Sequence, residues 1–170
     1  GTQFLLLGNA GTGVVLGTAQ ATTSGTSIDF TGLPLGVKRI TIMFVGVSTS
    51  GTDNWLIQIG PAGGAETSGY LGAGHIGATA SSPTVVNFTA GFGFPSASAA
   101  NVAHGAVVLS LENAAAFTWV CSGNLSLSSS AVFGGVSGSK STASAVTRVR
   151  ITTTAGTDTF DAGSVNISYE

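Results

Sequence analysis

Three glycines have the spacing of a nucleotide-binding motif. Gly72, Gly74 and Gly77 in GAGHIG match G-x-G-x-x-G, in which a glycine-rich turn approaches the pyrophosphate of a dinucleotide. That chemistry needs a buried strand before the motif, a helix after it and an acid about 20 residues later. The preceding ETSGYL is not an apolar strand, the following segment contains Pro83, and the next acid is Glu112. We therefore interpret the match as a coincidence in a chain with 26 glycines.

A serine and a lysine have the spacing found in serine acyl enzymes. Ser137 and Lys140 in SGSK fit S-x-x-K, where a helical turn brings the lysine amine to the serine hydroxyl. Nearby glycines oppose a helix, and the companion S-D-N and K-T-G motifs are absent from the sequence. The sequence also contains no G-x-S-x-G elbow, P-loop or H-E-x-x-H motif. We therefore expect a protein that is not an enzyme.

Metal ligands are sparse and scattered. His75 and His104 lie far apart in sequence, and a metal site would need further ligands around them. Asp158 and Asp161 in GTDTFDAG lack the dense alternation of oxygen ligands found in a calcium loop, so an Asx-type turn is the better interpretation. Cys121 is the only cysteine, which excludes an intrachain disulfide and a cysteine-based metal cluster within one copy. We expect no metal and no cofactor.

Aromatic residues beside polar turns form the best candidate binding patch. Trp55 follows the polar pair Asp53 and Asn54, and Tyr70 and His75 lie in a glycine-rich stretch. Sugar-binding proteins combine an apolar ring face with neighbouring hydrogen-bonding groups, so these five residues are candidate ligand contacts. The alternative is structural, with Trp55 filling the end of a core and Tyr70 capping a sheet.

The composition excludes several kinds of partner. Charged residues make up 7% of the 170 residues, and the net charge is −2. Five scattered basic residues provide no electrostatic footprint for nucleic acid, so we expect none as a partner. Gly, Ser or Thr interrupts every apolar run well before the ~20 residues that a membrane-spanning helix needs, so we expect no membrane insertion.

The elements that would position these residues are strands. Gly, Ser, Thr, Ala and Val dominate, which favours strands and turns over exposed helices. In residues 37–47, Ile40, Ile42 and Phe44 alternate with Arg39, Thr41 and Met43, and the other face is apolar enough to predict a central strand. After the turn STSGTDN, residues 55–59 read as the return strand of a hairpin. Further strands are predicted at residues 27–30, 84–92, 105–112, 117–127, 147–153 and 164–169.

About eight strands without helical patterns predict an all-β, antiparallel two-sheet β-sandwich with jelly-roll-like connections. We expect one domain over residues 1–170, with residues 1–20 as a possible lead-in from a longer fibre protein. The strand containing Trp119 and Cys121 is assigned to the core. Residues 61–83 and 128–145 are rich in small residues and resist assignment, so either segment is a candidate elaborated loop.

Three segments carry a resemblance to a known family. They are IDFTGLPLGVKRITIMFVGVSTSGTDNWLIQIG (residues 28–60), ETSGYLG (residues 66–72) and RVRITTTAGTDTFDAGSVNISYE (residues 148–170). The chain resembles the C-terminal β-sandwich domain of bacteriophage and prophage tail-fibre and related virion proteins. The resemblance implies a β-sandwich at the end of a fibre, usually a homotrimer, that faces the host surface and is located in the virion.

The composition suits an assembly. A homo-oligomer would cover part of an uncharged surface and protect exposed sheet edges that have few charged residues. We expect a non-catalytic fibre tip that binds a host cell-surface glycan or another envelope component. Two alternatives stay open: a purely structural virion module, such as a capsid-attached fibre or a trimerising cap, and a carbohydrate-binding module of a bacterial protein.

Overall fold

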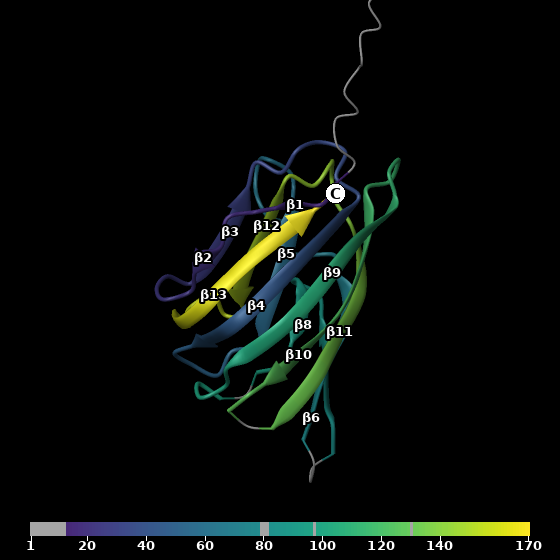
Figure 1. Cartoon of the computed structure of the whole chain (residues 1–170). Helices are drawn as coiled ribbons and strands as arrows, with labels where there is room; N and C mark the ends of the chain where they lie inside the picture. The colour runs from purple at the N-terminus through teal and green to yellow at the C-terminus, as the bar shows by residue number, and fades with distance from the viewer. Residues whose placement is uncertain (1–12, 79–81, 97, 130) are drawn as a thin grey trace, which may run out of the picture.

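The regular structure is entirely β. The computed structural model describes residues 13–78, 82–96, 98–129 and 131–170, and these contain thirteen strands in two antiparallel sheets (Figure 1). Within these ranges no helix is long and apolar enough to cross a membrane. The predicted all-β, two-sheet sandwich is therefore confirmed.

The larger sheet has nine strands, and two short strands near the start of the described chain pair with β13 at its edge. Its spatial order is β1 (Val15–Leu16), β13 (Phe160–Tyr169), β4 (Arg39–Thr49), β9 (Ala103–Asn113), β10 (Thr118–Leu127), β11 (Val132–Ser141), β6 (Leu71–Ala78) and β7 (Thr84–Phe88), and β2 (Gln20–Ala21) also pairs with β13.

The smaller sheet has four strands and covers part of the larger one. Its order is β3 (Ser27–Thr31), β12 (Arg148–Thr153), β5 (Trp55–Gly60) and β8 (Phe92–Phe94). The connections from β3 to β4, from β4 to β5 and from β12 to β13 each pass from one sheet to the other.

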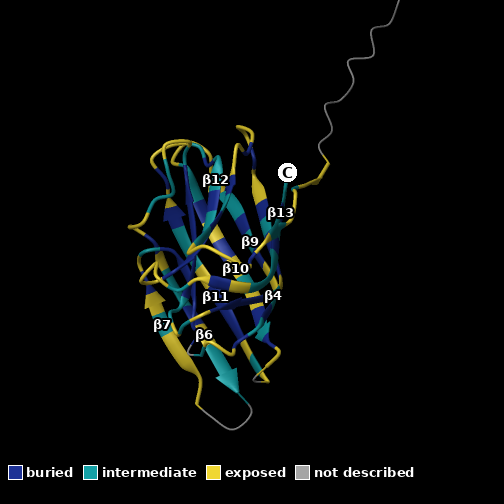
Figure 2. Ribbon diagram, turned by 90° about the vertical axis from the view of Figure 1, so that its left-hand side faces the viewer, coloured by how far each residue is buried: buried dark blue, intermediate teal, exposed yellow. Residues whose placement is uncertain are grey.

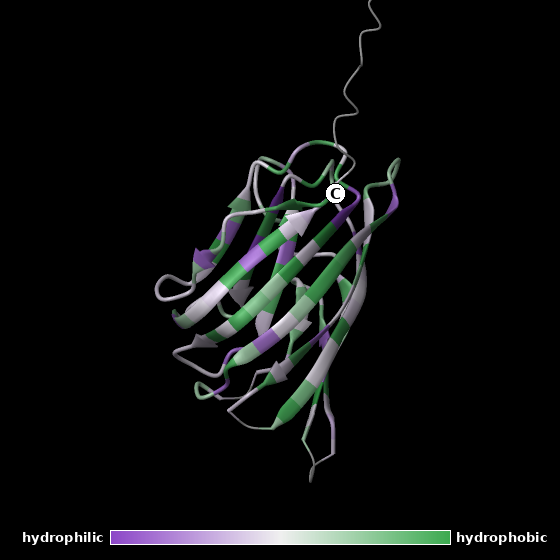
Figure 3. Ribbon diagram, viewed as in Figure 1, coloured by the Kyte–Doolittle hydropathy of each residue, from purple (hydrophilic) through white to green (hydrophobic). Residues whose placement is uncertain are grey.

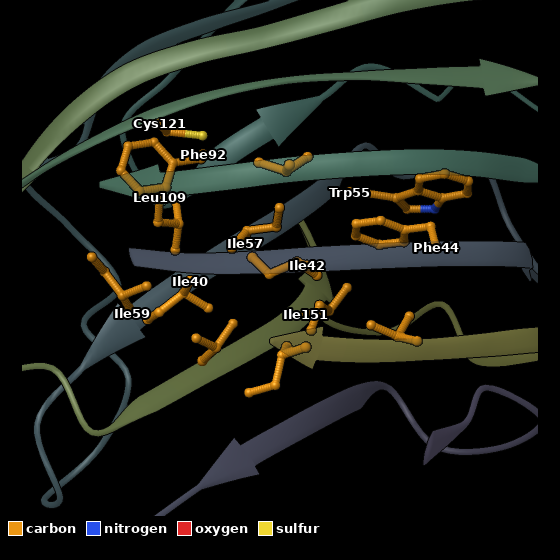
Figure 4. Packing of buried hydrophobic residues seen from close by; sticks show 14 of the residues in the cluster. Ile40, Ile42, Phe44, Trp55, Ile57, Ile59, Phe92, Leu109, Cys121 and Ile151 are labelled. Carbon is orange, nitrogen blue, oxygen red and sulfur yellow. The ribbon is translucent and has the colours of Figure 1, made fainter. Parts of the chain in front are cut away.

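Alternation along β4 explains how the core forms. Ile40, Ile42 and Phe44 are buried and point toward the smaller sheet, while Thr41 and Met43 between them are partly exposed. Because β4 lies between β13 and β9, the prediction of a central strand is confirmed. Figure 4 shows these side chains meeting those of the smaller sheet, and Figure 2 shows the buried layer between two more exposed outer surfaces.

The predicted hairpin of residues 37–47 and 55–59 is wrong. β4 pairs with β13 and β9, whereas β5 belongs to the other sheet and pairs with β12 and β8. Both strands bury apolar side chains, but they belong to opposite sheets. The loop between them passes over the end of the sandwich from one sheet to the other. An alternating pattern identifies a buried face but does not identify the hydrogen-bonding neighbour.

The two unassigned segments each contain a strand. Residues 61–83 include β6, residues 128–145 include β11, and these strands pair with each other. Four of their inward positions are glycine, namely Gly72, Gly74, Gly134 and Gly138, so the apolar alternation that marks a strand is interrupted in the sequence. At Gly74 the reason is a close approach, because a Cβ there would lie 2.1 Å from the Gly93 carbonyl oxygen on β8. The predicted strand 84–92 is divided into β7 and β8.

The proposed lead-in of residues 1–20 lies partly outside the described residues. From Val15 onward the segment belongs to the domain, since β1 and β2 both pair with β13. The Gly17 amide also donates to the Ile167 carbonyl oxygen at 2.8 Å.

The sandwich has two ends. One end, which we call the loop end, is formed by residues 50–54 between β4 and β5 and by residues 154–159 between β12 and β13. The described chain begins at Gly13 and reaches Glu170 at the opposite end, where β1 pairs with the last residues of β13 (Figure 1).

The close packing at Gly74 predicts a clear stability difference between two glycine substitutions. Gly74→Ala should destabilise the fold by about 1–3 kcal/mol, because β6 and β8 must separate to admit the methyl group. Gly63→Ala, whose added Cβ would meet nothing within 4 Å, should change stability by no more than about 0.5 kcal/mol. Urea unfolding followed by tryptophan fluorescence measures both; equal midpoints would contradict the packing described.

Candidate functional site

The five residues predicted to contact a ligand do not come together. Asp53, Asn54 and Trp55 lie where the loop end joins β5, Tyr70 directly precedes β6 at the opposite end, and His75 lies in the middle of β6. They therefore belong to three separate regions of the molecule.

Trp55 is part of the core. Its side chain is 3% exposed and stacks against Phe94 with ring centroids 6.3 Å apart, and its indole N–H donates to Thr49 Oγ1 at 3.2 Å. Figure 4 shows Trp55 beside Phe44 in the space between the sheets. The ring faces are covered by protein, so Trp55 fills the end of the core, as the structural alternative holds.

Tyr70 is also buried, at the other end of the core. Its ring meets Phe92 edge to face at 5.0 Å, and its hydroxyl accepts a hydrogen bond from the Ile59 amide at 2.8 Å. The hydroxyl donates to the Glu66 carbonyl oxygen at 2.9 Å. Burial raises the pKa of this phenol well above its usual value, so the hydroxyl stays a donor. Tyr70 holds the β5–β6 connection against the sheet and presents no ring face to solvent.

An ion pair between a buried lysine and a partly buried glutamate completes this closure. Lys140 Nζ lies 2.5 Å from Glu66 Oε2 and 5.4 Å from the centre of the Tyr70 ring, and the lysine side chain is 8% exposed. The Ala143 amide donates to Glu66 Oε1 at 2.7 Å. Burial alone would raise the pKa of Glu66, but the Ala143 amide and the Lys140 ammonium outweigh it, so the pKa is lowered. The pair ties the β5–β6 connection to β11.

The loop end is organised by aspartate and asparagine side chains. The Asp53 amide donates to Asp158 Oδ2 at 2.9 Å, and Asp53 Oδ2 accepts from the Ala155 amide at 3.1 Å. Asn54 Oδ1 accepts from the Ser96 amide at 2.9 Å. Three segments that are distant in sequence are thereby held in one arrangement.

A second set of contacts involves a serine. The Ser50 amide donates to the Thr159 carbonyl oxygen at 2.8 Å, and the Thr159 amide and hydroxyl both approach Ser50 Oγ at 3.0 Å. Around these contacts the loop end exposes the side chains of Ser50, Thr52, Thr154, Thr157 and Thr159. The loop end is thus a fixed surface rich in hydroxyl groups.

The two loops that meet at the loop end contain the same tripeptide, although the sequence alone does not pair them. Both contain the tripeptide Gly-Thr-Asp, at residues 51–53 and 156–158. The two copies meet directly, because the carboxylate of Asp158 lies against Gly51, where a Cβ would be 2.2 Å from Asp158 Oδ1.

His75 lies beside a shallow hollow on the outer face of the larger sheet. The hollow has a volume of about 250 Å³ and is lined by His75, Asn124, Ser122 and Ser137, with Gly135 between them. A Cβ at Gly135 would lie 3.0 Å from both Asn124 Oδ1 and His75 Cε1, so the glycine keeps the hollow open. It is an uncharged recess whose polar groups can both donate and accept hydrogen bonds.

A wider groove lies at the opposite end of the molecule from the loop end. It has a volume of about 500 Å³, and its apolar lining includes Val15, Pro34, Leu35, Val37 and Tyr169. Arg39 and Glu170, which form an ion pair at 3.6 Å, also line it.

The described residues do not assemble a reactive centre from the motifs in the sequence. Ser137 points outward from β11 and Lys140 inward, so the S-x-x-K pair lies on opposite faces of one strand. Strands β10 and β11 separate His75 from His104, whose Nδ1 accepts from the Gly46 amide at 3.3 Å. Burial raises the pKa of the Cys121 thiol to about 12. Among the described residues, no group of three His, Cys, Asp or Glu side chains could hold a metal ion.

The chain matches no protein-family model, no curated protein sequence and no solved structure.

The partly buried ion pair between Lys140 and Glu66 predicts that Lys140→Met is destabilising at neutral pH. Removing the ammonium leaves the Glu66 carboxylate without its charged partner, which should cost about 1–3 kcal/mol. The control is Arg39→Met, which breaks an exposed pair with Glu170 and should cost less than about 1 kcal/mol. Urea midpoints at pH 7 give both values.

The pH dependence has a definite sign. Since folding lowers the pKa of Glu66, its contribution is complete above the usual value of 4.5 and is lost as the pH falls through the lower folded-state pKa. The stability deficit of Lys140→Met should therefore shrink when the unfolding series is repeated at about pH 3. A deficit that is unchanged or larger in acid would show that the ion pair is not its cause.

Proposed function

We propose that this domain is a non-catalytic module of a phage fibre that binds the host bacterial surface through the loop end. The observation that carries the proposal is that hydrogen bonds hold the two Gly-Thr-Asp turns together as one fixed, hydroxyl-rich surface. Fixed loops lose little conformational freedom on binding, so each contact they make contributes more fully to affinity.

The chemistry of the loop end suits a glycan of the bacterial envelope. Serine and threonine hydroxyls both donate and accept hydrogen bonds, as sugar hydroxyls do, so the two surfaces can pair in many registers. The loop end also lies at the end of the sandwich opposite Gly13 and Glu170.

The family resemblance supports a domain at the end of a fibre that faces the host surface, without assigning the contact to particular residues. The resembling segments at residues 28–60 and 148–170 contain both Gly-Thr-Asp turns. The resemblance also implies a homotrimer in the virion, and we include self-association in the proposed function.

A purely structural virion module is the second candidate. It is favoured by the outer face of the larger sheet, which is uncharged and suited to contact between copies. A carbohydrate-binding module of a bacterial protein would expose a row of aromatic rings on one sheet. Trp55 and Tyr70 are buried, and Phe133 is the one aromatic among the strongly exposed apolar side chains described.

The proposed host contact is tested by removing two exposed hydroxyls from the loop end. Thr52→Ala/Thr157→Ala should weaken binding to whole bacteria and to their purified lipopolysaccharide or capsular polysaccharide by about tenfold or more. Two neutral hydrogen bonds of about 0.5–1.5 kcal/mol each account for this size of effect. Binding of the labelled domain to a panel of strains and envelope preparations provides the measurement.

The matched control removes the same groups from elsewhere. Thr31 and Thr67 are also exposed but lie away from the loop end, so Thr31→Ala/Thr67→Ala should bind as the unchanged protein does. Equal binding by both double variants would exclude the loop end as the contact. Failure of the unchanged domain to bind any strain or preparation would reject host binding and favour the structural module.

A further inference from the structure

The two outer surfaces of the sandwich differ in charge. On the smaller sheet, Arg150 of β12 forms a two-point ion pair with Asp29 of β3, with N···O distances of 2.9 and 3.0 Å. On the larger sheet, the outward positions of β13, β4, β9, β10, β11, β6 and β7 form what we call the outer face. Between its two borders, the outer face contains none of the chain's five Lys and Arg or seven Asp and Glu residues.

Charged residues mark the borders of the outer face. Arg39, Glu112 and Glu170 lie at the border away from the loop end, and Asp161 lies at the border beside it. Lys140 belongs to β11 but points inward to Glu66. In Figure 3 the strands of this sheet are mostly white to green between those borders. Charge is therefore confined to the margins of a wide sheet surface.

The outer face also exposes large apolar side chains. Of the nine strongly exposed large apolar residues described, five lie here: Val45, Leu71, Val85, Val120 and Phe133, with exposures between 41% and 73%. Leaving such side chains in water forgoes about 25 cal/mol for each Å² of apolar surface that a partner could cover. The depletion of charge and the exposed apolar side chains are features of an interface core, whereas the serines between them are typical of the rest of a protein surface.

The size of the outer face fits a stable contact. Seven strands about 4.8 Å apart and about 25 Å long present roughly 800 Å². This equals the area of about 800 Å² that each partner contributes to a standard protein–protein interface. The surface is also uneven, because the 250 Å³ hollow beside His75 adjoins strands from which Phe133 and Leu71 project.

We propose that the outer face is the surface through which copies of this chain pack against one another. The inference rests on the self-association included in the proposed function and identifies where it occurs. In a closed ring each copy has two neighbours, so the two halves of the face contribute roughly 400 Å² to each of two contacts, and the ring as a whole covers the full face of every copy.

The chemistry of the outer face favours a second copy as the occupant. A face with charge of one sign would repel an identical face, whereas this one has none between its borders. Its polar groups are Ser and Thr hydroxyls, Asn amides and imidazoles, each of which can donate and accept a hydrogen bond. Two copies of this face can therefore satisfy each other's hydrogen bonds. Two faces that carried only carboxylates or only ammonium groups could not do so, because carboxylates only accept and ammonium groups only donate.

The test places two like charges at the centre of the outer face. Ser122 and Ser137 are exposed and directly opposed on β10 and β11, so Ser122→Lys/Ser137→Lys alters the surface without changing the core. The unchanged domain should have a mass near three times 16.6 kDa by sedimentation equilibrium, and this variant should dissociate at least tenfold more readily. Thr31→Lys/Thr67→Lys adds the same charge elsewhere and should keep the assembled mass.

The possible outcomes separate the inference from the proposed function. An unchanged domain that stays monomeric at about 100 μM would overturn both self-association and the outer face as its interface, although host binding could still be measured. An assembled mass that survives Ser122→Lys/Ser137→Lys would overturn the outer face alone. Far-UV circular dichroism and the urea midpoint of each variant show that the monomer fold is retained, so a lost assembly cannot be attributed to unfolding.

Discussion

Burial of apolar side chains between the two sheets is the interaction on which every other feature depends. The chain has one cysteine, which is buried and free, so no disulfide within one copy supports the fold. Ile40, Ile42 and Phe44 of β4 face Trp55 and Ile57 of β5 across the core, and Tyr70 closes one end of it. The polar loops at the loop end keep their positions because the strands on either side of them are fixed in the two packed sheets.

The same packing explains why the surfaces differ. The two faces that meet in the core use most of the large apolar residues. Apart from the inward-pointing Lys140, the few charged residues lie on the smaller sheet, in the loops and at the margins of the larger sheet. The outer face is left with small, hydroxyl-bearing and apolar side chains. A surface of this kind is stable in water when a neighbour covers it, which connects the composition of the chain to its proposed assembly.

The strands with apolar alternation could be predicted from the sequence, and those with inward glycines could not. β4 and β13 have a clear period of two, whereas β6 and β11 place Gly72, Gly74, Gly134 and Gly138 where apolar side chains would normally mark a strand. The pairing of β4 with β13 and β9 depends on contacts between distant segments, so a local pattern predicted a hairpin that does not form.

The candidate site was only partly predictable for a similar reason. Asp53 and Asn54 were recognisable as turn residues, but their contacts with Asp158 and Ser96 depend on the fold. Residue type makes Trp55 and Tyr70 candidates either for a ligand contact or for the core, and their burial places them in the core. The low charge content predicted that part of the surface would be covered, and only the strand register shows that the uncharged residues share one face.

Two leucines provide the most direct test of the claim that this face is covered by other copies. Leu71 on the outer face and Leu35 away from it are 73% and 77% exposed in a single chain, so their intrinsic reactivities match. In hydroxyl-radical footprinting of the assembled protein, the account predicts that Leu71 is oxidised several times more slowly than Leu35. Oxidation of the two leucines at the same rate would contradict it.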